Sequence, residues 1–311
     1  MLRTNIILVL LAIFSASCAT DWDIPDTAKY PAEIDIVSLN IHYLVPEWDS
    51  TNWDARKYAV TEMLNTVNAD IVIFQEMETF HLHGSDPHTT SHENIQLDWI
   101  MRMVPNYTAG AIGNADEFPI TQPILYRSDR FTLLRQGFFY YSPTPDVIYS
   151  RPWNGGYPAF STWMHLRDTQ TEEEFIVLNS HLDAFNGKNR SDTIELIMKR
   201  LPEISRGLPV IAGGDYNMLT TDPILVELTS IGLKYIPMQG SSFHFGRGLH
   251  LYPSIDHFYI SPEWEVKDGG VMQKKWPSEE GMPGRRIAAR GGWNPDWPSD
   301  HHPVFARLLL Q

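Results

Sequence analysis

Eight polar side chains along the chain are of the types that bind divalent cations or transfer protons. Six offer oxygen donors and two are imidazoles, and in chain order they are Asn40, Glu76, His181, Asp215, Asn217, Asp256, Asp300 and His301. Oxygen donors without a cysteine or paired-histidine motif suit Mg²⁺, Mn²⁺ or Ca²⁺ better than structural Zn²⁺. Clustered carboxylates repel one another, so a divalent cation would stabilise them and attract a phosphate.

Each of these residues, taken alone, indicates little. An aspartate at the end of a strand most often forms a turn or caps a helix, and a single histidine is usually structural or solvated. A histidine beside an aspartate, as in Asp300-His301, can instead be oriented and kept basic by the carboxylate. The order of the whole set along the chain is therefore what indicates a catalytic site.

The segments that must position these residues alternate between strand and helix patterns. Apolar spacing predicts helices at residues 54–67, 94–103 and 193–204. Short apolar runs predict strands at residues 34–39, 71–74, 123–126, 131–139, 160–166, 175–179, 210–212, 255–260 and 304–309. The candidate side chains stand at strand ends, and α/β folds bind ligands beyond the carboxyl ends of strands. No linker rich in Pro, Gly or Ser divides residues 33–311, which predicts one domain.

Six segments resemble, in order, the motifs of the endonuclease/exonuclease/phosphatase family, which has the DNase I-like fold. They read SLNI at 38–41, IVIFQE at 71–76, NSHLD at 179–183, GGDYN at 213–217, IDHF at 255–258 and SDHHPV at 299–304. The segment WDARK at 53–57 is a weaker likeness to the bacterial branch. The likeness covers about residues 33–310, and its GDxN and SDHxPV patterns are the most specific parts.

The resemblance implies a four-layered α/β sandwich, in which two packed β-sheets are flanked by helices and one active site lies at the edge. It also implies that Asn40 and Glu76 hold a Mg²⁺ or Mn²⁺ ion, with Asp300 or Asp256 nearby. The expected reaction is hydrolysis of a phosphate ester by in-line attack of water.

The same resemblance implies roles for the other residues. Asp215 and Asn217 would position the attacking water and the phosphoryl oxygens. His301, oriented by a carboxylate, would be the general base, and Asp256 belongs with the catalytic residues. His181, where some relatives have tyrosine, would stabilise the pentavalent phosphorane or protonate the leaving oxygen.

The first 20 residues predict a signal peptide of the lipoprotein type. Arg3 gives a short positive region, residues 6–14 form an apolar run, and three small residues follow. Cys18, the only cysteine, resembles the acylated cysteine of a bacterial lipobox, although Ser15 stands where leucine is usual. The protein is therefore expected in the cell envelope, anchored to a bacterial membrane through Cys18. The alternative is an ordinary cleaved signal that leaves the protein periplasmic or secreted.

The chain is acidic, with 24 basic against 38 acidic residues and a formal net charge of −14. Such a surface attracts nucleic acid poorly, because non-specific affinity for phosphate polymers comes from Lys and Arg. A small basic group does occur at Arg285, Arg286 and Arg290. These arginines are candidates for contact with a substrate phosphate or headgroup, and a solvated loop is the plainer interpretation.

The sequence thus predicts an exported, divalent-metal-dependent phosphoesterase. Its substrate would be a mono- or diester of a small or lipid-linked alcohol, and it would act as a monomer. An extracellular nuclease would use the same chemistry on DNA or RNA, but it would need a basic groove lined with aromatic side chains. A surface-binding lipoprotein without activity is a third hypothesis, although degenerate relatives usually lose His or Asp residues from the motifs and none is missing here.

Overall fold

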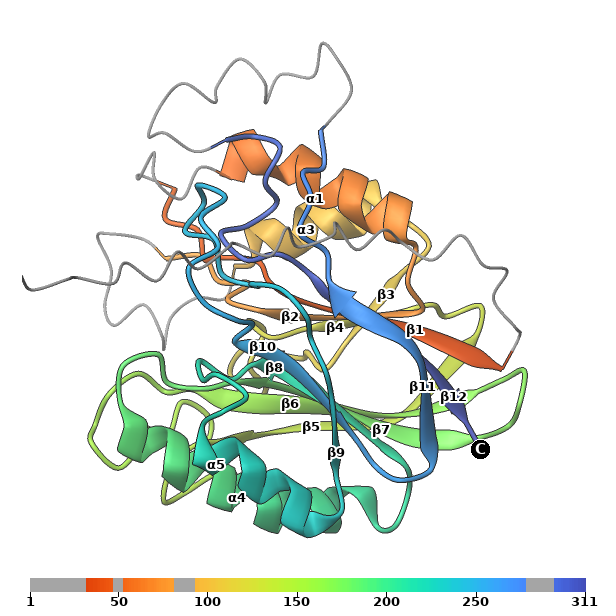
Figure 1. The fold of residues 1–311 in the computed structure, drawn as a ribbon, viewed down its shortest axis with the longest axis vertical. Coiled ribbons are helices and arrows are strands. Elements are labelled where there is room, and N and C mark those ends of the chain that lie inside the picture. The colour runs from red at the N-terminus through yellow and green to blue at the C-terminus, as the bar shows by residue number, and fades with distance from the viewer. Residues whose placement is uncertain (1–31, 47–52, 81–92, 278–293) are drawn as a thin grey trace, which may run out of the picture.

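The computed structural model describes residues 32–46, 53–80, 93–277 and 294–311. Two six-stranded sheets pack face to face, and helices cover the outer face of each sheet (Figure 1). Helices α1 (Trp53–Val67) and α3 (Ile95–Met103) cover one sheet, and α4 (Gly187–Ser205) and α5 (Pro223–Val226) cover the other. This four-layered α/β sandwich confirms the predicted fold class.

The first sheet has the strand order β11-β12-β1-β2-β4-β3. Its strands are β1 (Glu33–Asn40), β2 (Ile71–Gln75), β3 (Thr108–Gly110), β4 (Ile124–Tyr126), β11 (Trp264–Val271) and β12 (Val304–Leu310). In this sheet β1 and β2 run parallel, and the other neighbouring strands run antiparallel. Helix α1 connects β1 to β2, because parallel neighbours need a crossover rather than a hairpin.

The second sheet has the strand order β5-β6-β7-β8-β10-β9. Its strands are β5 (Phe131–Tyr140), β6 (Phe160–Asp168), β7 (Glu174–His181), β8 (Val210–Asp215), β9 (Lys234–Ile236) and β10 (Asp256–Ile260). Strands β7 and β8 are parallel and are joined by α4, while a 3₁₀ helix, η2 (Glu227–Ile231), follows α5. Each sheet is therefore built around one parallel pair with a helical crossover.

Three apolar layers hold the sandwich together. Ile73 of β2 and Phe258 of β10 belong to the layer between the sheets. Leu64 of α1 lies in the layer under the first pair of helices, and Ile197 of α4 lies in the layer under the second. Strands β1 and β2 are buried along their whole length. This explains why β2, IVIFQ, reads as a nearly continuous apolar run. The polar residues of β1 are buried with partners, since Asp35 pairs with Arg307 and Ser38 hydrogen bonds with Gln75.

The structure changes the bounds of some predicted elements. The helix predicted from residue 193 begins at Gly187, where the Asn186 side chain accepts a hydrogen bond from the backbone N–H of Asn189 at 3.1 Å. Its first turns are polar, so they lack the apolar spacing on which the prediction rests. Strands β3, β9 and β11 are not predicted, because the first two have three residues each and β11 carries charged residues and glycines.

Four candidate residues, Cys18, Arg285, Arg286 and Arg290, lie outside the described residues, as does the predicted signal peptide at residues 1–20. Their roles therefore stay predictions. Within the part of the chain that the structure describes, no helix has the length and apolar character needed to cross a bilayer.

Candidate active site

The fold brings all eight candidate residues into one cluster of contacts, and each sheet contributes half of them. The first sheet supplies Asn40, Glu76, Asp300 and His301, and the second supplies His181, Asp215, Asn217 and Asp256. The parallel registers align the strand ends within each sheet, with Asn40 beside Gln75 and His181 beside Asp215. The Asn40 amide then crosses between the sheets and donates to Asp215 at 2.9 Å.

The expectation that these residues follow the carboxyl ends of strands is wrong for part of the site. Asp256 begins β10, and Asp300 and His301 precede β12. Strand β10 runs antiparallel to β8, and β12 runs antiparallel to β1, so their amino ends lie at the same edge as the carboxyl ends of their neighbours. Asp256 pairs directly with Asp215 in this register.

The carboxylate of Asp215 lies at the centre of the cluster. Its Oδ2 atom accepts the hydrogen bond from Asn40 and lies 3.8 Å from the Nε2 atoms of both His181 and His301. Its Oδ1 atom accepts a hydrogen bond from the backbone N–H of Asn217 at 2.8 Å. Burial and the carboxylate that begins β10 raise the pKa of Asp215, while the two histidines and the Asn40 amide oppose the shift. One carboxylate oxygen therefore lies close to two imidazoles.

The sequence GGDYN positions Asp215 through its backbone. Gly214 has a φ of +137°, and a Cβ atom there would lie 1.9 Å from the carbonyl oxygen of Ser180 in β7. Only glycine allows this close approach of the two strands. Asn217 follows in the left-handed region, with a φ of +51°, and its amide donates to the carbonyl of Leu182 at 2.9 Å.

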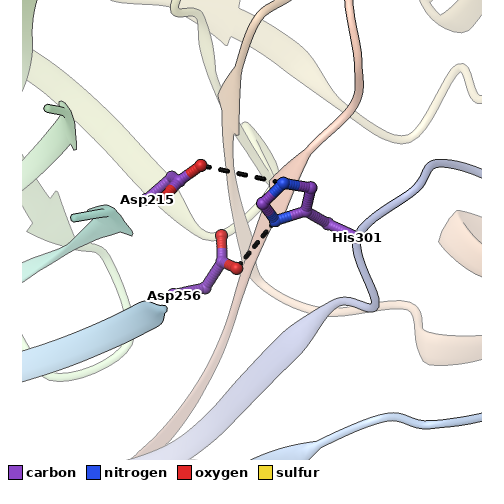
Figure 2. A group of neighbouring side chains, drawn as sticks. All are labelled: Asp215, Asp256 and His301. Atoms are coloured by element: carbon purple, nitrogen blue, oxygen red, sulfur yellow. Dashed lines mark hydrogen bonds and ion pairs between the residues drawn. The ribbon is translucent and has the colours of Figure 1, made fainter. Parts of the chain in front are cut away.

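Asp256 and His301 form a buried dyad. The Nδ1 atom of His301 lies 2.8 Å from Oδ2 of Asp256, and its Nε2 atom is the ring nitrogen nearer Asp215 (Figure 2). Burial acts to lower the pKa of His301, but attraction to Asp256, which also hydrogen bonds the ring, and to Asp215 and Asp300 raises it to about 10. A carboxylate at Nδ1 fixes the ring and leaves Nε2 to face a reacting group.

Glu76 and Asp300 face a common point beside His42. The Nδ1 atom of His42 lies 3.7 Å from Oε2 of Glu76 and 3.6 Å from Oδ2 of Asp300. The side chains of Glu76 and Asp300 are 24% and 18% exposed. A cation held between them could therefore keep several of its water ligands, as Mg²⁺ does in proteins. The Asn40 side-chain NH₂ donates to Oε1 of Glu76 at 3.1 Å, and its amide oxygen accepts from the backbone N–H of His42 at 3.0 Å, which leaves a second lone pair on that oxygen. The donor set of Glu76, Asp300 and the Asn40 amide oxygen therefore fits a hard divalent cation.

A second group within the described residues also has the composition of a metal site. One potential ligand atom from each of Asp215, Asp256 and His301 lies within 4.8 Å of the others. These side chains are only 1%, 1% and 6% exposed, and Nδ1 of His301 already contacts Asp256. Room for a hydrated cation is therefore found at Glu76 and Asp300 rather than in this trio.

Residues 37–301 match the sequence model of the endonuclease/exonuclease/phosphatase family. The chain belongs to this family. Its members are hydrolases and generally use a divalent metal. The match confirms the resemblance inferred from the six motifs. No curated protein matches the chain by sequence.

Solved structures of endonuclease/exonuclease/phosphatase proteins share the fold. A family member from Bacteroides thetaiotaomicron is 26% identical, with a TM-score of 0.71 over 90% of this chain and 98% of that one. A mannosyl-6-phosphatase from the same organism is 27% identical, with a TM-score of 0.72 over 89% of this chain and 100% of that one. The human Nocturnin catalytic domain with bound sulfate is 16% identical, with a TM-score of 0.61 and coverages of 92% and 97%. This last likeness shows the fold alone.

Two residues of this endonuclease/exonuclease/phosphatase site are not identified by sequence reasoning. His42 lies between the two carboxylates of the cation site, and its closeness to Asn40 in sequence is the one signal for it. Arg56 is fully buried, and its guanidinium donates to the carbonyls of Ile41, of His42 at 2.6 Å and of Pro298 at 3.1 Å. Arg56 thus ties the segment after β1 to the segment before β12, which explains its place in the WDARK segment.

Two other motif histidines are structural. The Nε2 atom of His257 donates to the carbonyl of Met218 at 2.8 Å, and Nε2 of His302 lies 2.9 Å from Nε2 of His250. Burial lowers the pKa of His257 to about 4 and that of His302 to about 2. Both rings are therefore neutral in the folded protein at physiological pH.

A cavity of about 580 Å³ opens beside Glu76 and His181. Small-molecule sites are typically ~300–1,000 Å³, so this cavity has the size of a substrate pocket. Glu78 lies in its wall, where it accepts a hydrogen bond from the Tyr157 hydroxyl. Burial raises the pKa of Glu78 to about 7, although the hydrogen bond from Tyr157 opposes the shift.

Proposed function

We propose that this chain is an exported, divalent-metal-dependent phosphoesterase that hydrolyses a mono- or diester of a small or lipid-linked alcohol. The observation that carries the proposal is the Asp256–His301 dyad directed at Asp215. In this arrangement His301 lies beside the carboxylate of Asp215, and the Asn40 amide donates hydrogen bonds to both Asp215 and Glu76.

His301 accepts the proton of the attacking water at Nε2. Asp256 holds Nδ1 and stabilises the imidazolium that forms, as a carboxylate does in other histidine-based sites. Asp215 lies 3.8 Å from Nε2, so a water molecule within hydrogen-bond distance of both groups would be oriented by them. This arrangement aligns the water before the reaction begins, which lowers the entropic part of the barrier.

His181 acts on the phosphoryl group or on the leaving oxygen. Its Nε2 atom lies 3.6 Å from Oε1 of Glu76 and 3.8 Å from Oδ2 of Asp215. From this position Nε2 can donate to a developing negative charge on the phosphoryl group or the leaving oxygen. Asn217, fixed by its bond to the Leu182 carbonyl, positions the phosphoryl oxygens.

Glu76, Asp300 and Asn40 would hold a Mg²⁺ or Mn²⁺ ion. When bound, such an ion offsets the charge of the phosphoryl oxygens and of the surrounding carboxylates. Because a hydrated cation needs room, the exposure of Glu76 and Asp300 supports this assignment over the buried trio that contains His301.

A small phosphorylated substrate is supported by the pocket and by one relative. The 580 Å³ cavity beside Glu76 and His181 is of small-molecule size, and a structure 27% identical to this chain is a mannosyl-6-phosphatase. A nuclease is disfavoured, because the chain is acidic and no lysine or arginine occurs among the described residues that line this cavity.

The enzyme would be exported and would act as a monomer. The N-terminal sequence supports export and a lipid anchor at Cys18. Arg285, Arg286 and Arg290 are candidates for contact with the phosphate, because they are a small basic group in an acidic chain.

The test is a substrate panel with purified protein and Mg²⁺, covering a phosphate monoester, a small diester, plasmid DNA and sphingomyelin. We expect turnover of a small or lipid ester, no cleavage of DNA, and loss of activity in His301→Gln. His165→Gln is the matched control, because His165 lies in β6 and pairs with Glu174 instead of the site. Cleavage of DNA in preference to the small esters, or no turnover of any of them, would contradict the proposal.

A further inference from the structure

We infer that the 580 Å³ pocket beside Glu76 and His181 receives the alcohol of the ester and selects a neutral sugar ring, with Phe185 as the stacking residue. This inference rests on the proposed phosphoesterase activity and specifies the class of alcohol. The position of the pocket supports it, because a phosphate at Glu76 and His181 would extend its alcohol into the adjoining space.

The pocket wall includes the aromatic side chains of Tyr43, Phe80, Tyr157 and Phe185. The Phe185 side chain is 99% exposed, although a phenyl ring is normally buried at least in part. An exposed aromatic ring at the edge of a pocket offers its face to a ligand. The C–H face of a sugar ring is flat enough and apolar enough to pack on it.

The loop between β7 and α4 fixes the backbone at Phe185. The Oδ1 atom of Asp183 accepts hydrogen bonds from the backbone N–H groups of Phe185 at 2.8 Å and of Asn186 at 2.9 Å. Its Oδ2 atom accepts a third from the Asn189 side chain at 2.8 Å, within the first turn of α4. The backbone that presents Phe185 is therefore ordered before a ligand binds, which reduces the entropy lost on binding.

The charges of the pocket favour a neutral ligand. No lysine or arginine occurs among its described lining residues. Two guanidinium groups lie behind the lining and donate to its backbone carbonyls, Arg151 to Gly156 at 3.2 Å and Arg190 to Asp183 at 2.9 Å. Asp183 is used by its own loop, and Glu78 accepts from Tyr157, so neither is a free anion for an ammonium headgroup. The Tyr43 hydroxyl, the Asn154 amide and the remaining acceptor positions of Glu78 can instead bind hydroxyl groups.

The experiment measures the ratio of kcat/KM for a hexose 6-phosphate to that for glycerol 3-phosphate, which has hydroxyls but no ring. Phe185→Ala should lower this ratio about tenfold, the size of one aromatic stacking contact. Phe185→Tyr keeps the ring and should keep the ratio. Val226→Ala is the control, since Val226 is an exposed apolar residue of α5 outside the pocket lining. The thermal midpoint of Phe185→Ala should equal that of the wild type, because the side chain is exposed.

An unchanged ratio in Phe185→Ala would overturn the inference. So would a higher kcat/KM for a nucleoside 5′-monophosphate or for phosphocholine than for any hexose phosphate. If the wild type hydrolyses no ester at all, the proposed function fails, and saturation-transfer NMR with a free hexose then tests the pocket by itself. Saturation transfer that is lost in Phe185→Ala supports the sugar pocket, and equal transfer in both proteins contradicts it.

Discussion

The Nδ1 atom of His301 lies 2.8 Å from Oδ2 of Asp256, and the two residues belong to different sheets. His301 precedes β12 in the first sheet, and Asp256 begins β10 in the second. The geometry of the dyad therefore depends on the apolar layer that packs the sheets together. Displacements of about 1 Å at such a site can cost about 10²-fold in rate, so core packing and catalysis are coupled here.

Replacing Asp256 by asparagine should lower the pKa of His301. The neutral amide keeps the size of the side chain but removes the strongest of the attractions that raise this pKa to about 10. NMR titration of the histidine rings in chelator-treated protein measures the effect, and His301→Gln identifies the resonance. An unchanged pKa in Asp256→Asn would show that the dyad does not control the ring.

The two catalytic histidines should shape opposite limbs of the pH–rate profile. His301 must be neutral to accept a proton. Its pKa is raised to about 10 in the metal-free protein, partly by Asp300, and a divalent cation held there would lower it. The rate should therefore fall as pH drops through the pKa of His301 in the metal-bound enzyme. His181 acts as a donor, so the rate should fall again at high pH.

His301→Ala should reduce the single-turnover rate by about 10²–10⁴, the usual range for one acid–base group, and flatten the acid limb. His181→Ala should chiefly remove the alkaline limb. Near-wild-type single-turnover rates in both variants would rule out these roles.

The sequence predicts the fold and most of the site because the motif residues directly follow or precede apolar strands. The rule for parallel strands could place His181 beside Asp215 in one sheet and Asn40 beside Gln75 in the other, although the packing of the two sheets against each other is not given by it. The positions of Asp256 and His301 could not, because they depend on which strands run antiparallel to the central pair. Pairing between strands distant in sequence leaves no local signal in either strand.

His42 and Arg56 could not be predicted for a different reason. The contacts of His42 with two carboxylates depend on its left-handed backbone, with a φ of +63°, which the residue type does not reveal. Arg56 acts through backbone carbonyls, and any sequence offers those. The burial of Arg56 in α1 is seen only in the structure.

Stability should fall as pH drops from about 6.5 to about 4, in part because of His257. Burial lowers the pKa of this ring to about 4, although its hydrogen bond to Met218 opposes the shift. In that pH window the unfolded chain binds a proton that the folded protein excludes, so the free energy of unfolding decreases as pH falls. The contribution is at most about 3 kcal/mol.

His257→Gln cannot take up a proton and should therefore lose less stability over the same window. Denaturant unfolding at a series of pH values measures the two slopes. Equal slopes for the variant and the wild type would contradict a buried neutral His257.

Cys18→Ala should move the protein from the membrane fraction to the soluble fraction. Acyl chains on the cysteine would supply the anchor, since each buried CH₂ contributes about 0.8 kcal/mol to membrane binding. Cell fractionation followed by immunoblotting measures the distribution. If the variant and the wild type fractionate alike, the N-terminal segment is an ordinary signal peptide.

The central claim is that a divalent cation held by Glu76 and Asp300 is required for ester hydrolysis, and its most direct test is the initial rate as a function of free Mg²⁺ after treatment with EDTA. The rate should be lost in excess EDTA and restored by Mg²⁺ or Mn²⁺. Glu76→Ala should stay inactive at every Mg²⁺ concentration yet remain folded, because it removes one charge from a repulsive cluster. Glu195→Ala, an exposed change on α4, should behave as the wild type. Full turnover in excess EDTA would contradict the account.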